Sequence, residues 1–93
     1  MIERFDHELR VSGALTLATA TASSEAGKQQ LIDNMVIDLE AVTEVDSTAL
    51  SVLFEWRRAA RARNLHISFR NLPDSMQSLA ALYGVADLVA PGV

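Results

Sequence analysis

The chain has 93 residues, of which 49% are apolar and 22% charged, so it can form one small hydrophobic core and is not a disordered tail. We expect a single domain over residues 1–93. The absence of cysteine excludes disulfides, iron–sulfur clusters and thiol catalysis. The formal charge of -4 argues against nucleic-acid binding, and no apolar run reaches the roughly 18 to 20 residues of a membrane span. We therefore expect a cytoplasmic protein that does not insert into a membrane.

The first third of the chain predicts a β-hairpin followed by a helix. Apolar and polar residues alternate in residues 2–5 and 8–12, with Asp6-His7 as the turn and Gly13 as the end of the second strand. From residue 14 to 30 the composition changes to Ala, Thr, Ser and Glu, with apolar residues about one helical turn apart. This spacing predicts a helix over 14–30, and Gly27 is a candidate early stop.

The remaining segments predict two more strands and two more helices. Residues 34–39 are rich in β-branched side chains and indicate a central strand. In residues 65–70 apolar and polar residues alternate, which indicates a strand with one solvent-exposed face. Residues 47–63 carry the strongest helical periodicity. A third helix is expected from Pro73 to Gly84, because proline suits the first helical turn and glycine the stop.

The order of these elements indicates an α/β fold. A strand–helix–strand unit requires a right-handed crossover between parallel strands. Two strands alternate between apolar and polar residues, which a sheet covered on both faces would not show. We expect a single-layer sheet of about four strands, with three helices mainly on one face.

The most informative motif is Asp46-Ser47-Thr48, which follows a buried strand ending at Leu39 and a short loop. The motif stands at the start of the strongest helix, where unpaired N–H groups carry a partial positive charge. Either Asp46 or Ser47 can cap that helix. Alternatively, Ser47 accepts a phosphate, which would add negative charge beside the carboxylates of Asp38, Glu44 and Asp46 and repel an acidic partner.

At this point the sequence resembles the STAS domain family, and the resemblance covers nearly the whole chain. The stretch Leu-Arg-Val-Ser-Gly-Ala-Leu at residues 9–15 is similar to the strand and Ser-Gly turn that open these domains. Asp46-Ser47 corresponds to the family's switch position, where anti-sigma-factor antagonists carry a serine phosphorylated by their kinase partner. Thr48-Ala49 differ from the small residue and glycine that commonly follow that serine.

Residues 79–89 are more similar to the small STAS subunit of a bacterial phospholipid ABC transporter that maintains outer-membrane lipid asymmetry. That resemblance implies a non-catalytic regulatory and assembly subunit, which binds the transporter's ATPase and, through it, the membrane permease. It also implies a position peripheral to the inner membrane, without contact with lipid. The alternative is an anti-sigma-factor antagonist that binds a kinase and is switched by phosphorylation of Ser47.

The expected partner-binding residues share one end or edge of the 47–63 helix. Arginines cluster between residues 57 and 63, either as a solvated helix end or as a surface for an acidic partner. Trp56 lies at the edge of the apolar stripe and suits either the core or a partner contact. The residues expected to bind the partner are Asp46, Ser47, Thr48, Ser51, Phe54, Arg58 and Arg61.

No pattern in the sequence indicates catalysis or a cofactor. His7 and His66 lie far apart and lack companions at metal-ligand spacing, and there is no glycine-rich phosphate loop. We therefore predict no enzyme, no metal and no cofactor. A ligand-binding or catalytic domain remains the third class of function, and it would require saturable binding of a nucleotide or lipid by the isolated chain.

Overall fold

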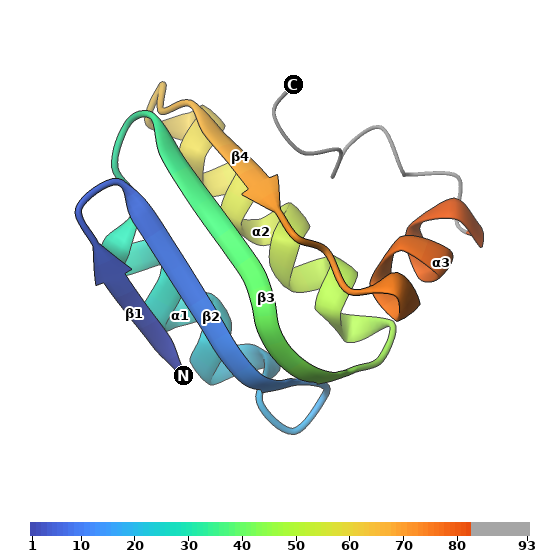
Figure 1. Cartoon of the computed structure of the whole chain (residues 1–93). Helices are drawn as coiled ribbons and strands as arrows, with labels where there is room; N and C mark the ends of the chain where they lie inside the picture. Colours follow the sequence, from blue (N-terminus) through green and yellow to red (C-terminus); the bar gives the residue numbers. More distant parts are fainter. Residues whose placement is uncertain (83–93) are drawn as a thin grey trace.

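Four strands form one mixed sheet in a computed structural model, which describes residues 1–82. The strands are β1 (Ile2–Phe5), β2 (Glu8–Leu15), β3 (Met35–Val45) and β4 (Ile67–Arg70), and they lie in the order β1-β2-β3-β4. The helices are α1 (Ala20–Gln30), α2 (Thr48–Ala62) and α3 (Asp74–Leu82). Helices α1 and α2 cover one face of the sheet, while α3 follows the carboxyl end of β4 (Figure 1). The expected α/β class, with about four strands and three helices, is confirmed.

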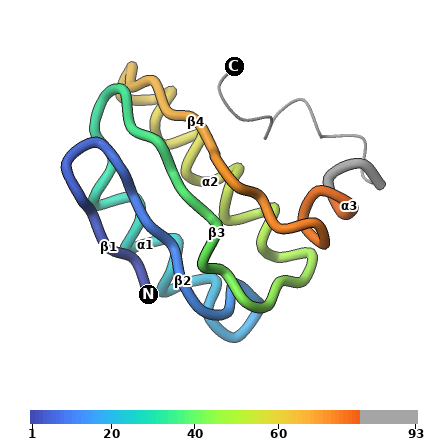
Figure 2. Tube along the Cα trace, viewed as in Figure 1, coloured from blue at the N-terminus to red at the C-terminus, as the bar shows by residue number. Residues whose placement is uncertain are grey.

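The pairing of the strands follows from the lengths of their connections. β1 and β2 are antiparallel across the tight turn at Asp6-His7, whereas β2, β3 and β4 are parallel and are joined through α1 and α2. Parallel neighbours need a crossover of a dozen or more residues, and each helix supplies one. As a result α1 and α2 run side by side beneath the sheet, and both begin at the end of the molecule where β2 and β3 finish (Figure 2).

The core lies between the sheet and the two helices. Alternate residues of the strands point into this core, and among them Leu9, Ile37 and Phe69 are fully or almost fully buried. Helix α2 contributes Leu53 and Trp56, which are also buried. The apolar stripe read from the sequence therefore faces the sheet, as the 3.6-residue period requires.

Two strands are longer than expected, and one helix is shorter. β2 does not end at Gly13, since it continues to Leu15 with Gly13 at a φ of 80°, where the pairing with β3 is irregular. Residues 14 and 15 belong to this strand because they pair with Glu44 and Val45 of β3, so α1 begins only at Ala20. Gly27 does not stop α1 early, since it lies buried inside the helix.

The short loop expected after Leu39 does not exist, because β3 continues to Val45. Val42 is buried in the core and the segment pairs with the extended part of β2, so packing and hydrogen bonds both support the longer strand. At the other edge, Leu65 and His66 precede β4, which begins at Ile67. The expected stop of the third helix at Gly84 lies outside the described residues.

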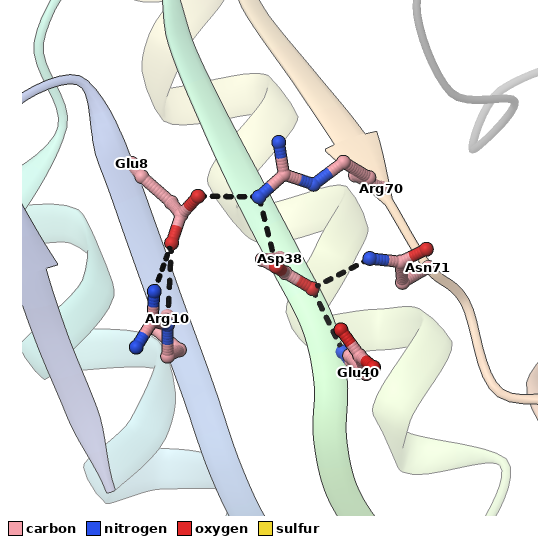
Figure 3. Close-up of polar contacts among 6 residues, drawn as sticks. All are labelled: Glu8, Arg10, Asp38, Glu40, Arg70 and Asn71. Carbon is pink, nitrogen blue, oxygen red and sulfur yellow. Dashed lines mark hydrogen bonds and ion pairs between the residues drawn. The ribbon is translucent and has the colours of Figure 1, made fainter.

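The sheet face opposite α1 and α2 is polar, as the alternation in the strands predicts. Figure 3 shows the network on this face: Arg70 of β4 reaches Glu8 of β2 and also pairs with Asp38 of β3, with 2.9 Å between the Arg70 Nη2 and Asp38 Oδ2 atoms. The Nη2 atom of Arg10 donates to the Oε2 atom of the same Glu8 at 2.8 Å. Asp38 is only 6% exposed, and its second oxygen accepts from Asn71 at 3.2 Å.

This position corrects one sequence-based expectation about Asp38. It lies seven residues before Val45, which along a strand is a distance of about 23 Å. Asp38 is therefore not a neighbour of Ser47, and it cannot oppose a phosphate there.

Candidate functional site

Asp46, between β3 and α2, is the residue that caps α2. Its Oδ1 atom accepts the backbone N–H of Thr48 at 2.9 Å and also the Thr48 hydroxyl. Its Oδ2 atom accepts the backbone N–H of Leu17 at 3.0 Å. One carboxylate thus satisfies a free N–H at the start of α2 and holds the turn between β2 and α1. Of the two candidate caps, the structure selects Asp46.

The same contacts keep Asp46 ionised. The hydrogen bond from the Thr48 side chain lowers the pKa of Asp46 most, followed by that from the Leu17 N–H, and together with the Thr48 N–H they outweigh partial burial. A negative charge at this point is also favoured by the positive end of the α2 dipole. The start of α2 therefore carries a fixed negative charge at neutral pH.

Ser47 occupies the N-cap position of α2 without capping it. Its φ and ψ of -63° and -20° are already helical, and its side chain makes no capping hydrogen bond. The side chain is exposed. The hydroxyl is therefore available to a partner or a modifying enzyme, next to the Asp46 carboxylate.

Five of the expected partner-binding residues form a line along the outer face of α2. Ser47, Ser51, Phe54, Arg58 and Arg61 follow one another at alternating intervals of four and three residues, which places them on one side of a helix. All are exposed except Phe54, which is half-buried. We call these five residues the α2 ridge. Its centre is an aromatic ring, one end carries hydroxyls and the other end carries arginines.

Thr48 and Asp46 lie beside the ridge and have different surroundings. Thr48 is half-buried and directs its hydroxyl to Asp46, so it supports the start of α2. It also borders a shallow groove of about 290 Å³ between α1 and α2. The spacing within α2 could not reveal this groove, because half of its lining comes from α1: Ala20, Thr21, Ser24 and Glu25, opposite Thr48, Ser51, Val52 and Glu55.

The arginine end of the ridge is partly neutralised. Arg58 pairs with Glu55, and Lys28 of α1 approaches the other oxygen of Glu55 at 3.4 Å. The nearby Arg58 charge is the largest cause that lowers the pKa of Glu55, and the hydrogen bond from Lys28 follows. Arg61 and Arg63 are exposed on the last turn and the C-cap. Both expected roles of the cluster, a solvated helix end and an acidic-partner surface, are compatible with this arrangement.

Trp56 belongs to the core and not to the exposed surface. It is 0% exposed, and its indole Nε1 donates to the carbonyl oxygen of Ser24 at 3.1 Å. The ring packs on Gly27, where an added Cβ would lie 2.3 Å from the Cε2 atom of Trp56. Of the two possibilities in the sequence, the structure selects the core.

The turn between β2 and α1 contributes to this site, which local sequence patterns did not predict. The sequence predicts a helix over residues 14–30, yet residues 16–19 form a turn in which the Leu17 N–H donates to Asp46. The Thr-rich composition of this segment was the available signal, since Thr favours turns over helix interiors.

Comparison with known proteins identifies the family. Residues 2–90 match the family described as "Mlab, STAS domain". The chain belongs to the MlaB-like STAS family. No curated protein matches the sequence.

Two solved structures share the STAS fold at low sequence identity. The anti-sigma factor antagonist SpoIIAA in its unphosphorylated form is 15% identical, with a TM-score of 0.68 over 94% of this chain and 82% of that one. A sulfate transporter family protein from Wolinella succinogenes is 14% identical, with a TM-score of 0.65 over 90% of this chain and 70% of that one.

STAS domains are in general non-catalytic regulatory domains that mediate protein–protein interactions. Within residues 1–82, no His, Asp and Glu side chains are grouped so that they could hold a metal ion. None of the helices in this part of the chain is long and apolar enough to cross a membrane.

Proposed function

We propose that this STAS domain is a regulatory and assembly subunit that binds the ATPase of a bacterial phospholipid ABC transporter. Through the ATPase it associates with the membrane permease on the cytoplasmic side of the inner membrane, and it supports outer-membrane lipid asymmetry. It has no catalytic role and does not contact lipid.

The observation that carries this proposal is the match to the MlaB-labelled family over residues 2–90. The α2 ridge supports a docking role, because four of its five side chains are exposed and a rigid helix presents them together. A half-buried aromatic residue, Phe54, lies among exposed polar neighbours, which is the composition of a protein interface with a small apolar centre.

Affinity purification from the native cells tests the proposal, with mass spectrometry of the recovered proteins. We expect a P-loop ATPase together with membrane permease subunits. Recovery of a small serine kinase and a sigma-factor regulator in their place would contradict the proposal.

The surface is tested by Ser47→Arg, which places a large cation at the start of the α2 ridge. The variant should lose the ATPase, because the added side chain occupies the contact area. Gln30→Arg is the matched control, since it adds the same charge at an exposed position at the far end of α1. Full recovery of the ATPase with Ser47→Arg would show that the ridge is not the docking surface.

The alternative function is a phosphorylation switch in an anti-sigma-factor antagonist. It is favoured by the exposed Ser47 hydroxyl, which makes no capping bond, and by the likeness in fold to SpoIIAA. This function requires a native intact mass heavier by one phosphate, with the increment absent in Ser47→Ala. A purely unmodified protein in cells that contain the kinase would exclude it.

A further inference from the structure

Leu17 is a large apolar side chain that points into solvent. In residues 1–79 the large apolar side chains that are exposed are Met1, Phe5 and Leu17, at 78%, 49% and 76%. Met1 is the first residue, and the Phe5 ring has the Arg10 guanidinium above it at 4.7 Å. Leu17 instead stands at the tip of the turn between β2 and α1.

The turn that carries Leu17 is held by its own hydrogen bonds. The Thr16 N–H donates to the Thr19 hydroxyl oxygen at 3.0 Å, and the Thr19 N–H donates to the Thr16 carbonyl at 3.0 Å. The Thr19 hydroxyl in turn donates to the carbonyl of Ala14 at 2.9 Å. Because these bonds fix the backbone of the turn, a partner that buries Leu17 does not have to order a flexible loop, which lowers the entropic cost of binding.

The turn also lies against the start of α2. The Leu17 N–H is bonded to the carboxylate of Asp46, the residue directly before Ser47. The same end of the molecule holds the turn and the start of α2 in both views (Figures 1 and 2). Ala20 and Thr21, which follow the turn, line the groove between α1 and α2 together with Ser51. The turn that carries Leu17 thus adjoins the start of the α2 ridge.

We propose that Leu17 is the apolar anchor of the docking surface, and that it inserts into an apolar pocket on the transporter ATPase. This inference rests on the proposed function and deepens it. The hydroxyls of Ser47 and Ser51 then form part of the polar rim around the buried leucine, as in interfaces with a small apolar core.

Charge disfavours a second copy of the chain as the occupant. A two-fold contact centred on Leu17 would bring the same patch of both copies together. The carboxylates of Glu44 and Asp46 near this end would then face those of the second copy, which is unfavourable. A different protein is therefore the better occupant.

The test measures binding of the ATPase recovered with the wild-type protein and then purified, using titration calorimetry. Leu17→Ala removes most of the apolar side chain without adding charge, and we expect the Kd to rise about tenfold or more. Leu17→Met keeps the apolar volume and should bind nearly as wild type does. Phe5→Ala is the matched control, because Phe5 is exposed and apolar but lies in β1 and away from α2. Thermal unfolding midpoints should be close for Leu17→Ala and wild type, since the side chain lies outside the core.

Different outcomes distinguish failure of the inference from failure of the proposed function. If Leu17→Ala binds the ATPase as wild type does while Ser47→Arg does not, the anchor is wrong and the proposed function stands. If the wild-type domain does not bind the ATPase, the proposed function is wrong, and the inference about Leu17 is wrong as well. Sedimentation that shows a wild-type dimer and a Leu17→Ala monomer would assign the leucine to self-association and overturn the inference.

Discussion

The contact between Gly27 and Trp56 determines how closely α1 can approach α2. A Cβ atom at position 27 would lie within 2.5 Å of three atoms of the Trp56 side chain. That ring is fully buried and is also fixed by its bond to the Ser24 carbonyl, so it has little freedom to move away. Glycine is needed here for space and not for backbone freedom.

Gly27→Ala should therefore destabilise the protein although alanine is the better helix former. The gain in helix propensity is about 1 kcal/mol, whereas forcing an extra carbon into a packed core costs about 1–3 kcal/mol. Because the added Cβ would lie only 2.3 Å from the Trp56 Cε2 atom, the cost should be near its upper end, and we expect a net loss of about 2 kcal/mol in the free energy of unfolding, measured by urea denaturation. The double variant with Trp56→Phe should show less than the additive loss, because the smaller ring makes room. A Gly27→Ala protein as stable as wild type would show that the two helices are not this close.

At the scale of the elements, Asp46 joins parts of the chain that are 29 residues apart. Its two oxygens bind the first turn of α2 and the turn before α1, respectively. The beginnings of the two parallel helices, and with them Ser47 and Leu17, are consequently held in one arrangement. This fixed geometry is what allows a partner to contact both at once.

Asp46→Ala should loosen both elements together. Amide hydrogen exchange at Thr48 and at Leu17 should become faster, and the unfolding midpoint should fall, because both N–H groups lose their acceptor. Asp46→Asn keeps one carbonyl oxygen and should release only one of the two amides. Faster exchange at Thr48 alone in the alanine variant would contradict the bond between Asp46 and the turn.

Across the whole molecule, several carboxylates are held in their charged form by hydrogen bonds. For Asp38, burial raises the pKa, but hydrogen bonds from Arg70, from the Glu40 N–H and from Asn71 outweigh it, so the pKa is lowered from 3.8. The hydrogen bonds from Arg10 and then Arg70 lower the pKa of Glu8 from 4.5. This network connects β2, β3 and β4 on the sheet face away from the helices (Figure 3).

Stability should accordingly be lost in acid. A carboxylate whose pKa is lower in the folded state contributes its full stabilisation above its unfolded pKa, and loses it as pH falls through the folded value. Because the unfolded values are 3.8 for Asp38 and 4.5 for Glu8, the unfolding midpoint should change little between pH 7 and 5 and fall below pH 4.5. The Asp38→Asn variant should be less stable than wild type at pH 7, and its unfolding midpoint should fall less as the pH is lowered below 4.5. A wild-type midpoint that is the same at pH 3 and pH 7 would refute this account.

Periodicity alone determined the class of the fold and the face of α2 that reaches the core. A helix or strand exposes its residues at a fixed interval, so the sequence places Leu53 near the sheet and Ser47, Ser51 and Arg58 on the outside, whereas it leaves Trp56 at the edge of the apolar stripe. The Asp46-Ser47 pair likewise marked the start of α2, because caps use short polar side chains.

Interactions between distant segments decided the rest. β2 and β3 continue to Leu15 and Val45 because each provides the other's hydrogen-bond partners, and neither segment signals this by itself. For the same reason Asp38 belongs to a network with Arg70 and not to the surroundings of Ser47. The place of Leu17 beside α2 depends on a bond to Asp46 across 29 residues, and local propensity carries no information about such a contact.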